Sequence, residues 1–188
     1  DAIMNGMQNT AMPKWDHMFS KDDADGMVDW LMDWKDNTNF KLNLEEIKGT
    51  WTKLADREEL AKKYPNAVDT KSVLDITFAT ERDASLVDFI DSTNGKVLSR
   101  HKAGFAVHVT VTNKQNPRYA YSISRSGRLT MFDIAAPGQP AIASVQVGFE
   151  SRGLAVSPDG KYVIAGNYTP GGAVLCDAMT LEPLKAYD

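Results

Sequence analysis

A histidine and several arginines recur at matching places along the second half of the chain. His108 and Arg152 are 44 residues apart, and a second set, Arg82, Arg125 and Tyr168, follows at intervals of 43 residues. In a repeated fold, residues at equivalent positions lie on the same face of the molecule. Guanidinium groups bind anions, and neutral imidazole is a common metal ligand. The spacing therefore predicts an anion-binding site that also offers a metal ligand.

The elements that position these side chains are predicted to be short strands. Three strand-like segments end in Asp91, Asp133 and Asp177, which are spaced by 42 and 44 residues. A period of about 40–45 residues with four short strands is typical of propeller blades. We therefore predict a mostly-β chain in which residues 73–188 form about three four-stranded blades of a β-propeller. A sandwich of meandering strands is the alternative.

His108 lies in an apolar run that follows the dipeptide Gly104-Phe105, and this dipeptide recurs 44 residues later as Gly148-Phe149. An imidazole inside an apolar strand costs free energy unless a partner uses its nitrogen. That partner is either a backbone carbonyl, which would make His108 a histidine of the core, or a ligand. The recurrence of arginines around it favours the ligand.

The first 36 residues differ from the rest, since they contain six of the eight methionines and three of the four tryptophans. Ser20 followed by Asp23 is a helix-start signal, and it predicts a helix over residues 21–34 with one apolar stripe. One short helix cannot bury such a stripe alone, so it needs a partner. Met12 lies in the loop before this helix, as does the axial methionine of haem in small c-type cytochromes.

Residues 37–72 are polar and predict a linker that lies over another part of the protein. Within this linker, Asp56–Lys63 is expected to form one or two helical turns that end at Tyr64-Pro65.

Composition excludes several other classes of protein. The net charge is −4 and the basic residues are scattered, which argues against a nucleic-acid partner. No apolar run approaches the roughly 18 residues needed to span a membrane.

Cys176 is the single cysteine, so it forms no intrachain disulfide, and we expect it to be buried. His17 is expected at the surface and His101 on an exposed strand edge, and neither has the neighbours of a zinc site.

Several short motifs follow one another in a characteristic order. They are Met12-Pro-Lys-Trp15 with the helix that follows it, Thr80-Glu-Arg-Asp-Ala-Ser-Leu86, Phe89-Ile-Asp91, Ala103-Gly-Phe-Ala-Val-His108, Ile123-Ser-Arg-Ser-Gly-Arg128, Gly148-Phe-Glu-Ser-Arg152, Ala165-Gly-Asn-Tyr168 and Met179-Thr-Leu-Glu-Pro183. In this order and spacing the chain resembles the cytochrome cd1 family of haem d1 nitrite reductases and their relatives in haem d1 biosynthesis.

The resemblance implies a cytochrome c-like domain, whose last helix is in residues 1–36, followed by an eight-bladed propeller that carries haem d1. It assigns roles to the residues found above: Met12 as ligand of haem c iron, His108 as proximal ligand of haem d1 iron, and Arg82, Arg125, Arg152 and Tyr168 as the surroundings of the carboxylates of haem d1.

The chain also departs from the family pattern. The haem c attachment motif is absent from this sequence, and the distal histidines of the reductases would lie beyond Asp188. Val111 stands where the reductases carry an arginine, and the turn that starts at Thr169 reads Thr-Pro-Gly-Gly, which is closer to the biosynthetic relatives. Three blades leave a sheet edge unpaired, so we expect an internal segment of a longer chain or one half of a split protein.

The function implied by the resemblance is reduction of nitrite to nitric oxide in the periplasm, with electrons passing from haem c to haem d1. The implied partners are nitrite, a small c-type cytochrome or cupredoxin as electron donor, the remaining propeller and cytochrome c portions, and a second copy in a homodimer. No catalytic acid is expected within this segment. Two alternatives stay open: a haem d1 biosynthesis protein that binds and dehydrogenates a d1 precursor, and a haem-free propeller that serves as an interaction module.

Overall fold

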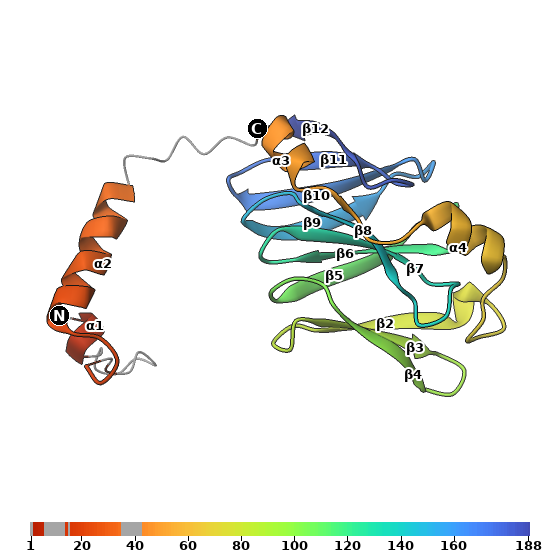
Figure 1. The fold of residues 1–188 in the computed structure, drawn as a ribbon, viewed down its shortest axis with the longest axis horizontal. Helices are drawn as coiled ribbons and strands as arrows, with labels where there is room; N and C mark the ends of the chain where they lie inside the picture. The colour runs from red at the N-terminus through yellow and green to blue at the C-terminus, as the bar shows by residue number, and fades with distance from the viewer. Residues whose placement is uncertain (1, 6–13, 15, 35–42) are drawn as a thin grey trace. The chain divides into compact units, whose positions relative to one another are not determined.

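The computed structural model describes residues 2–5, 14, 16–34 and 43–188, and the chain divides into two compact units, residues 1–40 and 41–188. The first unit contains the helices α1 (Ala2–Asn5) and α2 (Lys21–Trp34). The second unit contains all the strands found in the described residues (Figure 1). Met12, the predicted haem c ligand, lies outside the described residues.

Helix α2 begins where the sequence predicts it. Ser20 and Asp23 cap each other: the Asp23 amide donates to Ser20 Oγ at 3.1 Å, and the Ser20 amide donates to Asp23 Oδ2 at 2.9 Å. These two bonds satisfy amides that the first helical turn leaves without partners. Val28 and Leu31, on the apolar stripe, are exposed. These two residues of the stripe are therefore open to solvent, while Met27 is half-buried.

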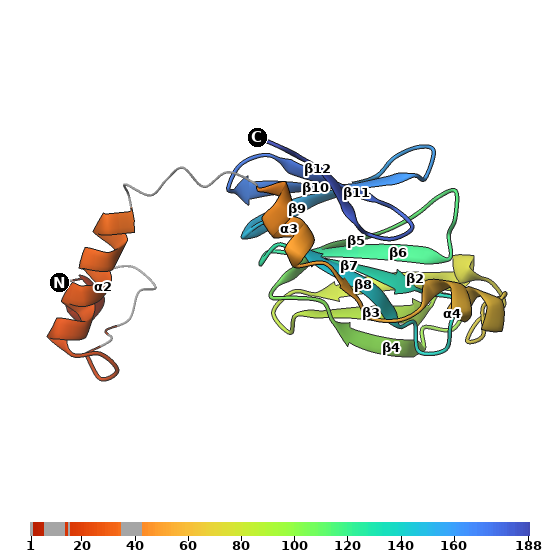
Figure 2. The same cartoon turned by 45° about the horizontal axis from the view of Figure 1, so that its top comes forward.

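The second unit consists of three antiparallel sheets, stacked in chain order in Figures 1 and 2. The first sheet has the order β2-β3-β4, the second β1-β8-β7-β6-β5 and the third β12-β11-β10-β9. The strands are β1 (Thr52–Lys53), β2 (Ile76–Glu81), β3 (Leu86–Asp91), β4 (Val97–Lys102), β5 (Val107–Thr112), β6 (Tyr119–Ser124), β7 (Arg128–Asp133), β8 (Ala141–Gln146), β9 (Glu150–Val156), β10 (Tyr162–Thr169), β11 (Ala173–Asp177) and β12 (Pro183–Tyr187). The mostly-β prediction is confirmed.

The repeating unit is complete in the second and third sheets and shorter in the first. Asp91 ends β3, and its repeat equivalents Asp133 and Asp177 end β7 and β11, each the third strand of its repeat. The strands β2, β3 and β4 therefore correspond to the second, third and fourth strands of a repeat. Among the described residues, the first sheet has no counterpart of β5 and β9, so the prediction of four strands is wrong for this sheet.

These three aspartates explain the period in the sequence, because each caps the turn that follows its strand. Asp91 Oδ1 accepts from the Thr93 amide, and Asp177 Oδ1 accepts from the amides of Met179 and Thr180. Asp133 Oδ1 likewise accepts from the amides of Ala135 and Ala136 in its turn. An aspartate satisfies such turn amides with its own side chain, which is why this residue type recurs there.

Apolar side chains fill the spaces between neighbouring sheets. The cluster between the first and second sheets includes Val87, Phe89, Val107 and Phe132. The larger cluster lies between the second and third sheets and includes Tyr121, Ile123, Leu129, Met131, Val163, Val174 and Cys176. Strand β5 contacts β2 and β9, and β9 also contacts β6, so the first strand of a repeat lies against the preceding sheet.

Within the second unit, a segment we call the strap (residues 43–72) packs on the sheets. It contains α3 (Leu44–Gly49), β1 and α4 (Arg57–Lys63). The helical turns expected near Asp56–Lys63 are present as α4, whereas α3 was not predicted. Ile47 is buried in the larger cluster, and β1 pairs with β8. The strap thus covers part of an outer sheet edge that would otherwise be open.

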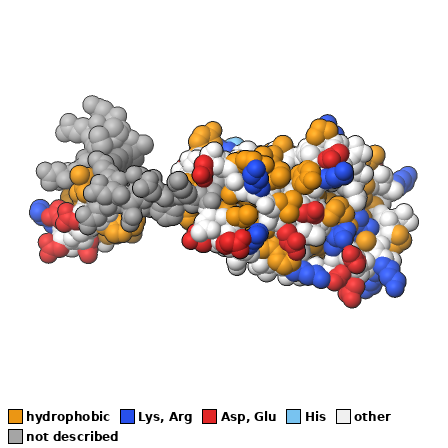
Figure 3. All heavy atoms as spheres, turned by 90° about the horizontal axis from the view of Figure 1, so that it is seen from above, with side chains coloured by type: hydrophobic (Ala, Val, Ile, Leu, Met, Phe, Trp, Pro, Cys, Tyr) orange, Lys and Arg blue, Asp and Glu red, His pale blue; other side chains and the backbone are white. Residues whose placement is uncertain are grey.

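Beyond residue 70, the described helical structure is one short 3₁₀ turn, Val73–Asp75. None of the helices in the described ranges is long and apolar enough to cross a membrane. The face of the second unit shown in Figure 3 mixes basic, acidic and hydrophobic side chains without a large patch of one charge, in agreement with the scattered charges of the sequence.

Candidate functional site

The repeat-equivalent residues lie at one end of the strands in all three sheets. We call this row of strand ends and turns the site edge. Arg82 follows β2 and Arg125 follows β6, each in the turn to the next strand, while Tyr168 is near the end of β10. His108 and Arg152 are near the starts of β5 and β9. Because neighbouring strands are antiparallel, the start of one lies beside the end of the next. The topology thus brings all of them to one edge, as the repeat predicted.

His108 is the extra residue of a β-bulge. Val107 pairs with Ser124 and Val109 pairs with Ile123, which leaves His108 without a partner on β6. A bulge turns the side chain of its extra residue away from the regular alternation of the strand. The His108 side chain is exposed, whereas Val107 beside it is fully buried. The alternative that His108 is a core histidine is therefore wrong.

Arg152 and Tyr168 also lie at irregular positions. On β9 and β10, Gly153 pairs with Gly166 and Ser151 pairs with Asn167, so Arg152 is the extra residue of a bulge at the place equivalent to His108. Tyr168 is skipped in the same ladder, because the pairing continues from Asn167 to Thr169. The guanidinium carbon of Arg152 lies 5.1 Å from the centre of the Tyr168 ring, a cation–π contact.

Arg125 and Arg152, from neighbouring sheets, share one acceptor. Arg125 Nη2 donates to Glu150 Oε1, and Arg152 Nη2 donates to the same oxygen at 3.3 Å. We call Arg125, Glu150, Arg152 and Tyr168 the arginine cluster. The hydrogen bond from Arg125, followed by that from Arg152, lowers the pKa of Glu150 from its ordinary value. At neutral pH the cluster therefore contains two guanidinium charges and one carboxylate.

Arg152 has a further donor that Glu150 does not use. Its Nε is buried and has no hydrogen-bond partner among the described residues. A buried donor without an acceptor costs free energy. A carboxylate whose two oxygens accept from Nε and Nη2 together would satisfy this guanidinium better.

Arg82 and His108 are not joined to the arginine cluster by a contact. Arg82 is exposed, and in the described structure its only hydrogen bond is made by its carbonyl, which accepts from the Ser85 amide at 3.1 Å. The structure thus brings two of the three predicted arginines and the tyrosine into contact, and places the third arginine and the histidine on the same edge apart from them.

The sequence pattern did not mark two kinds of residue that lie at the site edge. Glu150 is one, and it is recognisable only by its contacts with both arginines. The others are Phe105 and Phe149, which are 71% and 59% exposed. Their backbone amides bond to Ser126 Oγ and to the Thr169 carbonyl, which places both rings at the site edge. The recurrence of Gly-Phe was the signal that could have identified these two.

The remaining histidines and the cysteine are not part of the site edge. His17 is exposed, as predicted. His101 is on the edge strand β4, as predicted, but its ring is half-buried: it packs against Phe89 and Phe132 and has a nitrogen 2.8 Å from the Gly138 carbonyl oxygen. Cys176 is fully buried, as predicted, and this burial raises its pKa to about 12. Among the described residues there is no group of three or more His, Cys, Asp or Glu side chains that could hold a metal ion.

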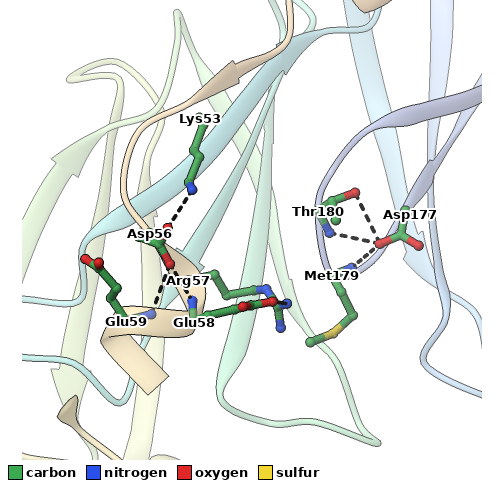
Figure 4. A network of polar contacts seen from close by, with 8 residues as sticks. All are labelled: Lys53, Asp56, Arg57, Glu58, Glu59, Asp177, Met179 and Thr180. Carbon is green, nitrogen blue, oxygen red and sulfur yellow. Dashed lines mark hydrogen bonds and ion pairs between the residues drawn. The ribbon is translucent and has the colours of Figure 1, made fainter. Parts of the chain in front are cut away.

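A cavity of about 310 Å³ lies between the strap and the outer part of the second and third sheets, with Met131 and Met179 among its lining residues. Figure 4 shows the charged side chains beside it. Four of them form two ion pairs, Lys53 with Asp56 at 2.6 Å and Arg57 with Glu58 at 3.2 Å. The repeat-equivalent residues are not among those that line it, so the site edge is the stronger candidate.

The chain is similar to several known proteins. The chain is 27% identical over 178 residues to the nitrite reductase of Stutzerimonas stutzeri, which covers 93% of this chain and 31% of that protein. It is 34% identical over 96 residues to the dihydro-heme d1 dehydrogenase of Pseudomonas aeruginosa, covering 51% of this chain and 19% of the relative. It is 35% identical over 109 residues to Protein NirF of Stutzerimonas stutzeri, covering 57% and 27%. The chain thus spans less than a third of each of these relatives.

A solved structure, the dihydro-heme d1 dehydrogenase NirN in complex with DHE, aligns with 98% of this chain and 38% of its own length, at a TM-score of 0.75 and 24% identity. This likeness establishes that the chain shares the fold of that protein, with a propeller-like arrangement of its three sheets. A family model, the cytochrome D1 heme domain, matches residues 71–188. The chain therefore belongs to the cytochrome D1 heme domain family.

Proposed function

We propose that this chain contributes part of the binding site for haem d1 or a d1 precursor, at the site edge, and that the protein acts in haem d1 biosynthesis. The observation that carries the proposal is the pair of equivalent bulges in β5 and β9. One bulge exposes His108, and the other presents Arg152 beside Arg125.

The residues at the site edge suit such a group in three ways. An exposed imidazole without a hydrogen-bond partner in the described structure is available as an iron ligand. Two guanidiniums, one with an unused buried Nε, match the carboxylates of a tetrapyrrole. The exposed rings of Phe105, Phe149 and Tyr168 offer apolar surface for a planar macrocycle.

When such a group is bound, His108 would hold its iron, and Arg125 and Arg152 would hold its carboxylates. The aromatic rings would pack against the macrocycle and exclude water from it. When bound, the macrocycle supplies the conjugated system and the iron that take up electrons. The residues of this chain position the group, and the acids and bases of the reaction are assigned to other parts of the protein.

Two observations favour biosynthesis over nitrite reduction. The identities with the dihydro-heme d1 dehydrogenase and NirF, 34% and 35%, exceed the 27% with nitrite reductase. By the resemblance to the family, Val111 also stands where the reductases usually carry an arginine. Nitrite reduction remains the second candidate, because the match to nitrite reductase covers 93% of this chain.

For the whole protein we further propose a complete propeller preceded by a cytochrome c-like domain that contains residues 1–36, with Met12 as haem c ligand. Location in the periplasm, a homodimer and a small electron-transfer protein as partner belong to the same proposal. Each of these statements rests on the likeness of the chain to its longer relatives.

The proposal is tested in the full protein by the substitution His108→Ala. The visible bands of a bound d1-type haem should be lost or strongly shifted, while those of haem c persist, because only the d1 iron loses its ligand. Arg152→Ala should weaken retention by about 1–3 kcal/mol, the contribution of a charge-assisted hydrogen bond. His17→Ala, at an exposed histidine of the first unit, is the control.

The wild-type protein separates the two candidate activities. Conversion of dihydro-haem d1 to haem d1 without nitrite turnover supports biosynthesis, whereas production of nitric oxide from nitrite supports reduction. If His108→Ala leaves the d1 spectrum unchanged, the assignment of His108 as iron ligand is wrong.

A further inference from the structure

A carboxylate occupies the middle of the predicted anion site. Glu150 begins β9, and its Oε1 accepts hydrogen bonds from Arg125 of the preceding sheet and from Arg152 of its own sheet. A site that only binds anions has no need of an acidic group between its guanidiniums. The position of Glu150 therefore requires a separate explanation.

One effect of Glu150 is to compensate the charge of the two arginines. Two guanidiniums that approach one another repel, and a carboxylate between them removes most of that repulsion. Glu150 therefore stabilises the cluster in the protein without ligand. The same carboxylate repels an incoming carboxylate, so it opposes the binding of an anionic ligand.

The three side chains are open enough for exchange. The side chains of Arg125, Glu150 and Arg152 are 31%, 34% and 41% exposed. Glu150 can therefore turn toward solvent, and a ligand can reach the exposed part of each guanidinium, without disruption of the buried core.

Arg152 also gains from such an exchange. Glu150 reaches Nη2 through one oxygen at 3.3 Å, and the buried Nε has no acceptor in the described structure. A carboxylate aligned with the edge of the guanidinium bonds to Nε and Nη2 together, the geometry that makes arginine–carboxylate pairs strong.

We propose that Glu150 is an exchangeable counter-ion of the tetrapyrrole site: it neutralises Arg125 and Arg152 until a ligand carboxylate takes its place. This inference rests on the proposed function. It adds that Glu150 limits the affinity of the site for its ligand. Because each binding event must displace Glu150, the carboxylate-bearing macrocycle is held less tightly than the two arginines alone would hold it, which favours its release.

The test is the substitution Glu150→Gln in the full protein, which keeps the size of the side chain and removes its charge. The probes are iron protoporphyrin IX, which has two free carboxylates, and its dimethyl ester, which has none. Affinity and dissociation rate are measured by absorbance titration and stopped flow. Glu45→Gln, which removes a surface ion pair with Lys48 on α3, is the matched control.

We expect Glu150→Gln to bind the free acid about tenfold more tightly, mainly through slower dissociation, and to bind the ester as the wild type does. In the double variant with Arg152→Gln, the gain should become smaller, since one guanidinium is missing. Glu150→Ala provides a second charge-removing variant if the amide disturbs folding, which far-UV circular dichroism reports.

Weaker binding of the acid, or an equal change for acid and ester, would overturn the proposal and make Glu150 a residue that only positions the arginines. If the wild type binds neither probe nor haem d1, the proposed function itself is wrong. The two failures are therefore distinguished by the wild-type titration.

Discussion

At the scale of single residues, the site edge depends on side chains that the backbone turns away from the regular strand pattern. His108 and Arg152 are each the extra residue of a bulge, and bulges are frequent next to functional sites because they redirect a side chain. The neighbours of these residues, such as Val107 and Ser151, are fully buried and hold the strands in place. The same short segment thus serves the core and the site.

The charge of Glu150 makes the stability of the arginine cluster depend on pH. Its pKa is lowered in the folded protein from 4.5, so its ionised form stabilises the fold above that value and loses this effect as pH falls through the lowered pKa. We expect the free energy of unfolding of the wild type to exceed that of Glu150→Gln at pH 7, and the difference to shrink as the pH is lowered below 4.5.

Chemical denaturation of both proteins across this pH range measures the difference. The substitution Glu45→Gln, whose ion pair lies within one helix, controls for the general loss of a surface charge. A difference that stays constant with pH would show that Glu150 stabilises the fold by packing and not by its charge.

At the scale of elements, the repeated turn between the third and fourth strands holds each sheet together. Asp133 and Asp177 cap their turns through the same pattern of amide hydrogen bonds. Their surroundings differ, because Asp133 is fully buried and also paired with Arg118 at 2.7 Å, whereas Asp177 is half-buried. The equivalent positions therefore contribute differently to stability.

This difference predicts unequal effects of the same substitution. Asp133→Ala leaves a largely buried guanidinium without its partner and should destabilise the fold by about 3–5 kcal/mol. Asp177→Ala removes a turn cap and should cost about 1 kcal/mol, as a lost cap usually does. Denaturant unfolding of the two variants measures both values, and equal losses would contradict the distinction.

At the scale of the whole molecule, the second unit has open sheet edges. In the first sheet β2 pairs only with β3, since no strand equivalent to β5 and β9 lies beside it in the described structure. The strap covers the outer edge of β8, but within the described residues β4 and β12 each have one strand neighbour. Unpaired strand edges favour association with other chains.

We therefore expect residues 1–188, produced alone, to associate or aggregate, with helix α2 adding its exposed Val28 and Leu31 to the apolar surface. Size-exclusion chromatography with light scattering measures this. The longer protein proposed above, in which further strands would pair with these edges, is the control. A monomer of residues 1–188 that unfolds cooperatively would contradict the expectation.

The sequence by itself determined the features that depend on neighbours along the chain. The turn-capping aspartates, including Asp91, revealed the repeat, and Ser20 with Asp23 marked the start of α2. The repeat then placed His108 and Arg152 on one edge. Such features are readable because turn chemistry, helix capping and period involve residues a few positions apart, and because equivalent residues of a repeat take equivalent places.

Only the tertiary structure decided the features that depend on pairing between distant segments. The apolar run around His108 reads as a buried strand, and the pairing with β6 shows that this residue is bulged and exposed. His101 reads as an edge residue, yet it packs against Phe132 of the next sheet. Glu150 gains its place between two arginines because neighbouring sheets bring their turns together. Register and contacts between sheets are set by the packing of the whole unit, which no local pattern of residues specifies.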